Sequence, residues 1–132
     1  MTRRESRELA FVLLFEKTFS DSPLEEILEN AGEAREIVND PFALALAEGV
    51  VLHTEEIDAS ISEFSHKWSK DRLSRVTLSI LRLAIYEMKW ENTIPVSVSI
   101  NEAVELAKRY GGEADASFIN GVLGGVARRL EG

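Results

Sequence analysis

The pattern closest to an enzyme site is Glu63 followed by His66, an acid and a histidine three residues apart. Di-metal sites in helical bundles use this spacing, but they need a second such pair and two further carboxylates. The other histidine, His53, has no acid three residues before it. Adjacent carboxylates such as Glu25 and Glu26 diverge by about 100° on a helix, so they cannot flank one bond as acid and base. We therefore expect neither a catalytic pair nor a metal site.

The absence of cysteine narrows the chemistry further. Disulfides, thiolate metal sites, iron–sulfur clusters and cysteine nucleophiles are excluded. The chain also has no glycine-rich phosphate loop and no serine elbow. No apolar stretch approaches the roughly 20 residues of a membrane span. We expect a protein without catalytic activity, cofactor or membrane contact, located in the reducing cytoplasm.

Charge is distributed unevenly along the chain. The formal net charge is −8, but residues 21–63 hold 12 acids and one base, a local charge of −11, which leaves +3 for the rest. At physiological salt charges are screened over about 8 Å, so an acidic lobe and a basic face can coexist on one domain. A phosphate-bearing partner is therefore compatible with the acidic total.

The bases outside that block form two groups. Arg3, Arg4 and Arg7 lie in the first turns of a predicted helix, where the positive end of the helix dipole favours anions. Along a later helix a stripe at spacings of 4, 3, 4 and 3 combines bases, a hydroxyl and an aromatic ring: Arg75, Ser79, Arg82, Tyr86 and Lys89. Single-stranded RNA binds to guanidinium planes and aromatic rings. The alternative interpretation is solvated arginines beside a core tyrosine.

Helical signals explain how these residues are positioned. Thr2 and Glu5 form a capping-box pattern, and Asp40 before Pro41 is a second helix start. Apolar residues recur at helical spacing in six or seven segments, which makes the chain an all-α protein with one domain, residues 1–132. The predicted helices cover about 3–19, 22–32, 41–67 (with a bend near Gly49), 69–90, 100–110 and 115–130.

Two features within these segments allow more specific predictions. Residues 94–100 alternate apolar and polar side chains but have no second strand to pair with, so we expect an extended lead-in before a helix capped by Ser99 and Glu102. Gly121, Gly124 and Gly125 weaken the last helix by about 1 kcal/mol each relative to alanine. We expect them to allow a neighbouring helix or a ligand to approach closely.

Four ordered motifs give the chain a recognisable signature. They are Leu81-Arg82-Leu83-Ala84-Ile85-Tyr86-Glu87, Ile94-Pro95, Ile100 to Lys108 with Tyr110-Gly111, and Ser117-Phe118-Ile119-Asn120-Gly121-Val122-Leu123. Together with the arginine-rich start, this sequence resembles the NusB family of transcription antitermination factors over essentially its full length. Residues 21–63 contribute little to the resemblance.

The resemblance implies a fold of two packed three-helix bundles, in which the 94–100 segment enters the following helix early. It also implies binding of boxA-type RNA in nascent ribosomal transcripts, a heterodimer with the ribosomal protein NusE, and action on the RNA polymerase antitermination complex. Carried over by position, the RNA-binding residues are Arg3, Arg4, Arg7, Arg82 and Phe118, the last as a stacking residue. We expect Arg7→Glu and Phe118→Ala to weaken RNA binding without changing the thermal midpoint.

Other residues of the matched motifs have structural interpretations. Glu87 is expected to be an ion-pair partner within the bundle, and Asn101, Glu102 and Asn120 are expected to cap or bridge helices. The surface for the protein partner is placed around Asp71, Arg75 and Thr77.

Two other functions remain open from the sequence. One is an accessory domain related to NusB-like domains of ribosomal-RNA methyltransferases, and the other is an acidic protein-interaction module without RNA binding. The sequence also leaves open whether the free protein forms a homodimer.

Overall fold

The computed structural model describes residues 2–30, 40–65 and 72–132, and within these ranges it contains seven helices and no strand. The helices are α1 (Arg3–Lys17), α2 (Leu24–Asn30), α4 (Pro41–Leu52), α5 (Thr54–Phe64), α6 (Arg75–Trp90), α7 (Val96–Tyr110) and α8 (Glu113–Glu131). The all-α prediction is confirmed. The predicted helix limits at 32, 67 and 69 lie outside the described residues.

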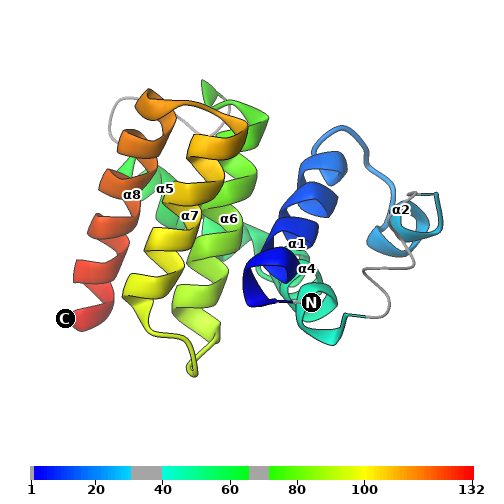
Figure 1. Ribbon diagram of the computed structural model, residues 1–132, viewed down its shortest axis with the longest axis horizontal. Coiled ribbons are helices and arrows are strands. Elements are labelled where there is room, and N and C mark those ends of the chain that lie inside the picture. Colours follow the sequence, from blue (N-terminus) through cyan, green and yellow to red (C-terminus); the bar gives the residue numbers. More distant parts are fainter. Residues whose placement is uncertain (1, 31–39, 66–71) are drawn as a thin grey trace.

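The helices form two groups, as Figure 1 shows. α1, α2 and α4 pack together at one end of the molecule, and α6, α7 and α8 form a row at the other end, with α5 packed on α6 and α8. α6 also contacts α1 and α4, so it joins the two groups. The two packed bundles that the resemblance implied are thus confirmed, with α5 packed as an additional helix on the second bundle.

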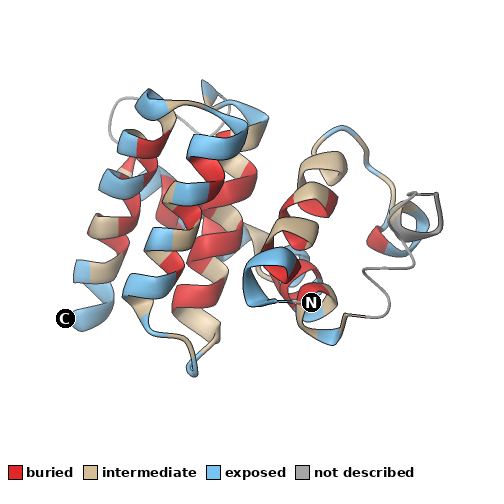
Figure 2. Cartoon of the chain, in the orientation of Figure 1, coloured by how far each residue is buried: buried red, intermediate tan, exposed pale blue. Residues whose placement is uncertain are grey.

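Buried residues line the inward faces of both groups (Figure 2). α6 carries the largest share, including Ile80, Leu81, Leu83 and Ile85, which are at most 2% exposed. This burial confirms the prediction that the helix, which is apolar around much of its circumference, is the most buried one. The core is continuous from α1 through α6 to α8.

α1 and α4 begin at the capping residues that the sequence predicted. The Thr2 hydroxyl accepts a hydrogen bond from the Glu5 amide, and the Glu5 carboxylate accepts one from the Thr2 amide, which confirms the predicted capping box. The Asp40 carboxylate caps α4 through the amides of Phe42 and Ala43. Helical structure is interrupted at His53, which ends α4 and begins α5, close to the predicted bend near Gly49.

The prediction of an extended segment over residues 94–100 is wrong. α7 begins at Val96, directly after Pro95, as the family resemblance implied. Ser99 therefore lies inside the helix and is buried, so it forms no capping box with Glu102. The alternation of apolar and polar residues is short, and the spacing of Val96, Ile100 and Ala103 fits one helix face equally well.

Only one of the three glycines of α8 has a close neighbour that requires it. A Cβ atom on Gly125 would lie 2.5 Å from the ring of Phe64 on α5. Gly121 has open space around it, and a Cβ on Gly124 would make an ordinary contact of 3.5 Å with Arg128. The expected close approach is therefore confirmed at Gly125 alone. In α4, Gly49 similarly leaves room for the ring of Tyr86.

Candidate nucleic-acid interface

The first turn of α1 presents two exposed arginines, Arg3 and Arg4, held in place by the capping box. Hydrogen bonds from Thr2 lower the pKa of Glu5, so this acid stays ionised beside the helix start. The guanidinium of Arg3 lies 3.8 Å from the centre of the Phe42 ring on α4. Arg3 therefore faces the first bundle.

Arg4 faces the second bundle. Its guanidinium donates to the Glu102 carboxylate on α7, with a closest N–O distance of 3.0 Å, and this pairing raises the pKa of Arg4. The expectation that Glu102 bridges helices is thus confirmed.

Arg7 has a different environment from its neighbours. The Nε of Arg7 donates to both carboxylate oxygens of Glu87 on α6, at 3.0 and 2.8 Å. The Ser99 hydroxyl of α7 donates to the same carboxylate at 3.1 Å. All three residues are buried, so this cluster joins α1, α6 and α7 inside the protein. The ion-pair role expected for Glu87 is confirmed, whereas an RNA contact by Arg7 stays a prediction.

One turn after Arg4 on α1, Glu8 bridges to the end of α7. Its carboxylate accepts from Arg109 at 2.6 Å and from the Tyr110 hydroxyl at 2.8 Å. Burial raises the pKa of Tyr110, and the hydrogen bond to Glu8 adds to that effect. The Tyr110 ring also lies 4.9 Å from that of Phe11, so apolar contact supports the polar one.

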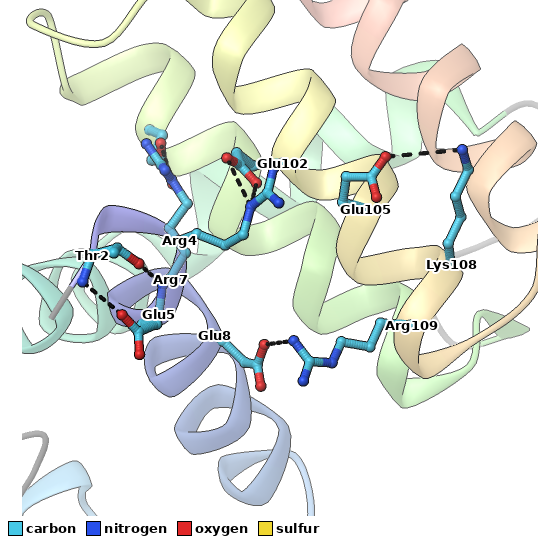
Figure 3. Close-up of polar contacts among 10 residues, drawn as sticks. Thr2, Arg4, Glu5, Arg7, Glu8, Glu102, Glu105, Lys108 and Arg109 are labelled. Carbon is cyan, nitrogen blue, oxygen red and sulfur yellow. Dashed lines mark hydrogen bonds and ion pairs between the residues drawn. The ribbon is translucent and has the colours of Figure 1, made fainter.

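These contacts border an open groove between α1 and α7, which we call the α1–α7 groove (Figure 3). It has a volume of about 300 Å³. Its lining consists of Arg4, Arg7, Glu8, Glu102, Glu105, Leu106, Lys108 and Arg109. Figure 3 shows Glu102 and Arg109 of α7 meeting Arg4 and Glu8 of α1, whereas Glu105 and Lys108 pair with each other on α7. The groove places several cations within one concave surface.

Sequence reasoning missed the α7 side of this groove. Lys108 and Arg109 occupy the last turn of α7 just before Gly111. Two adjacent bases at a helix end are ordinary partners of the negative end of the helix dipole, so the pattern did not suggest a site. Only the tertiary fold places them along the same groove as Arg4.

The basic stripe on α6 is oriented differently from what its spacing suggested. Arg82 donates twice to Asp58 of α5 at 2.9 Å, and Lys89 donates to the Ser60 hydroxyl at 2.6 Å. Tyr86 packs over Gly49, and its ring stacks with those of His53 and Trp90. Ser79 is fully buried, and its hydroxyl has no hydrogen-bond partner among the described residues. Apart from the exposed Arg75, the stripe therefore faces α4 and α5, and the RNA contact predicted for Arg82 stays a prediction.

Phe118 lies near the start of α8 and is half-buried against the core. α8 occupies the far side of α7 from α1 in Figure 1. The ring does not line the α1–α7 groove. Convergence of Phe118 with the arginines, and its stacking on RNA, therefore stay predictions.

The predicted protein-partner surface is described in part. Asp71 lies outside the described residues, and Thr77 is buried. Arg75 is exposed; it donates to the Thr18 carbonyl at the end of α1, and its guanidinium lies 4.3 Å from the centre of the Phe19 ring. Phe19 is 63% exposed.

Within the described ranges, no group of three histidine, aspartate or glutamate side chains is arranged to hold a metal ion, and His66 falls outside them. The same ranges contain no helix of the length and apolarity needed to cross a bilayer. The fold and the groove together define an all-helical two-bundle protein with a groove of paired cations and carboxylates between its bundles.

Comparison with known proteins specifies this class. The model of the NusB family matches residues 4–128, so the chain belongs to the NusB family. A transcription antitermination protein NusB from Clostridium botulinum is 46% identical over 138 residues, covering 94% of this chain and 98% of the relative. The structure of T. maritima NusB superposes with a TM-score of 0.84 at 39% identity, covering 97% of this chain and 92% of that one.

A second solved structure contains ligands. In the crystal structure of the antitermination factors NusB and NusE in complex with double-stranded RNA, the matching chain has a TM-score of 0.79 and 27% identity. The match covers 96% of each chain.

Proposed function

We propose that this chain is a transcription antitermination factor that binds RNA together with NusE and acts on the elongating RNA polymerase in the cytoplasm. The observation that carries the proposal is the α1–α7 groove, where Arg4, Lys108 and Arg109 present exposed cations on one concave surface. Guanidinium and ammonium groups of this kind bind phosphate oxygens. The names of the relatives, and the NusB–NusE–RNA complex among the matching structures, support the same function.

The proposal assigns no reaction to the protein. The chain works as an adaptor whose affinity comes from phosphate contacts and from base stacking. Arg3 and Arg4 at the start of α1 would contact the RNA backbone, and Phe118 would stack on an unpaired base. Arg7 and Arg82 are held by Glu87 and Asp58, so in this proposal they position the helices around the site.

Binding of a labelled boxA-type single strand tests the proposal, with a scrambled strand as control and with NusE present or absent. We expect sequence-dependent binding that tightens when NusE is added. The slope of log affinity against log salt should be about 0.7 per phosphate contact. Equal binding of both strands with and without NusE would contradict the proposal, as would a flat salt response.

The role of Phe118 needs its own pair of variants, because the ring also packs on the core. Phe118→Leu keeps most of the apolar packing and removes the aromatic face, whereas Phe118→Ala removes both. If the ring stacks on a base, Phe118→Leu should weaken RNA binding by about 1 kcal/mol or more while the thermal midpoint changes little. Unchanged binding of the leucine variant would show that Phe118 only packs.

A further inference from the structure

Every exposed cation of the α1–α7 groove is paired with a carboxylate. Arg4 pairs with Glu102 at 3.0 Å, Arg109 with Glu8 at 2.6 Å and Lys108 with Glu105 at 3.9 Å (Figure 3).

The fourth cation of the groove, Arg7, is neutralised by a buried carboxylate beneath the groove surface. Arg7 is buried on Glu87, so its charge is already balanced inside the protein. The groove surface therefore holds three exposed cations and three carboxylates, and it is close to neutral. An anion that enters must displace carboxylates from the cations that it contacts.

These pairs can be opened at low cost. The side chains of Arg4 and Arg109 are 66% and 65% exposed, and those of their acids are 19% and 25% exposed. Exposed ion pairs of this kind contribute little stability, because water and salt screen them. A phosphate can thus replace the carboxylate, provided that it binds more favourably.

The Arg4–Glu102 and Arg109–Glu8 pairs are also separated along the groove. Glu102 and Arg109 lie seven residues apart on α7, which is two helical turns or about 10 Å. A single phosphate group reaches only one of these positions. A chain of phosphates can occupy both, and its second contact then forms at high effective concentration.

We propose that Glu8 and Glu102 are specificity-determining residues of the α1–α7 groove. They compete with the ligand for Arg109 and Arg4, so the groove binds an isolated phosphate weakly and favours a polyanionic nucleic-acid strand that contacts both positions. This inference rests on the proposed function, since it concerns RNA binding at the same groove.

The test uses Glu102→Gln, Glu8→Gln and the double variant. Glutamine keeps the shape and a hydrogen-bond acceptor but removes the charge that holds the guanidinium. Each single variant should bind the single-stranded RNA about two- to fivefold more tightly, the fold-change that corresponds to the usual strength of an exposed ion pair. Competition by inorganic phosphate should become measurable at lower phosphate concentration in the double variant.

Glu55→Gln is the matched control, because Glu55 is exposed on α5 and its replacement changes the net charge by the same amount. A thermal melt checks that all variants fold. If the unaltered chain binds RNA and both groove variants bind no better than Glu55→Gln, the inference is overturned while the proposed function stands. If neither the unaltered chain nor the double variant binds RNA, both are overturned. Binding by the double variant alone would support the inference.

Discussion

Arg4 and Arg7 lie one turn apart on α1, and each pairs with a glutamate of another helix. The Arg7 and Glu87 side chains are 6% and 2% exposed, whereas Arg4 and Glu102 are 66% and 19% exposed. Breaking the buried pair leaves an uncompensated charge in the interior, whereas the guanidinium of Arg4 is already two-thirds exposed, so water screens its pair with Glu102. The same chemical pair is therefore structural at one position and open to competition at the other.

The largest effect is expected at the buried pair. Arg7→Met leaves Glu87 buried without its cation, which should cost about 3–5 kcal/mol of unfolding free energy. For a domain of this size the thermal midpoint should fall by roughly 10 °C or more. This replaces the sequence-based expectation that substitution of Arg7 leaves the midpoint unchanged. The fall in the thermal midpoint of Arg7→Met is measured by thermal denaturation monitored by circular dichroism.

The control for this variant removes both charges. The double variant Arg7→Met, Glu87→Leu buries no unpaired ion, so most of the stability should return. A double variant as unstable as Arg7→Met would show that the ion pair is not the reason for the loss.

Asp40 has an intermediate environment between these two extremes. It caps α4 and accepts a hydrogen bond from the buried hydroxyl of Ser6 on α1. Asp40→Ala removes the cap and leaves that hydroxyl without its partner, so a loss of about 1–2 kcal/mol is expected in urea denaturation. Asp40→Asn keeps a capping oxygen and should lose less.

The same contact predicts a pH dependence. The hydrogen bond from Ser6 lowers the pKa of Asp40 in the folded protein. Its stabilisation is therefore complete above the ordinary aspartate pKa of about 3.9 and is lost as the pH falls through the lower folded value. Between about pH 5 and pH 3 the unaltered chain should lose more stability than Asp40→Asn. Equal losses would argue against this contribution from Asp40.

A smaller change in stability is expected at the exposed pair. Arg4→Ala should alter the unfolding free energy by less than about 1 kcal/mol. Its effect should appear in RNA binding instead, where the salt slope falls by about 0.7 if one phosphate contact is lost. A large fall in stability with an unchanged salt slope would reverse the contrast with Arg7.

The smallest effect is expected at Lys108, whose ammonium lies 3.9 Å from Glu105 within one helix. Lys108→Ala should leave the thermal midpoint unchanged within error, because exposed pairs of this kind contribute a few tenths of a kcal/mol. Its RNA affinity should still fall if this side of the groove contacts phosphate. Lys108→Arg, which keeps the charge, is the control.

The fold could be predicted from the sequence wherever local signals were strong. The capping box at Thr2, the start of α4 at Asp40 and the burial of α6 each follow from residues close together in the chain. The site could be predicted only in part. The spacing of Arg3, Arg4 and Arg7 placed them on one helix, but it could not show that Glu87, 80 residues away, buries Arg7. For the same reason the spacing of the α6 stripe could not show that Arg82 faces Asp58 of α5.

The cluster of Arg7, Glu87 and Ser99 also bears on the order of folding. Glu87 and Ser99 lie on consecutive helices, but Arg7 is 80 residues away from Glu87, so we expect the contact of Arg7 to form late, when α1 packs against the second bundle. Interactions that form after the rate-limiting step change the unfolding rate more than the folding rate. We therefore expect the cluster to lengthen the lifetime of the native state more than it speeds folding.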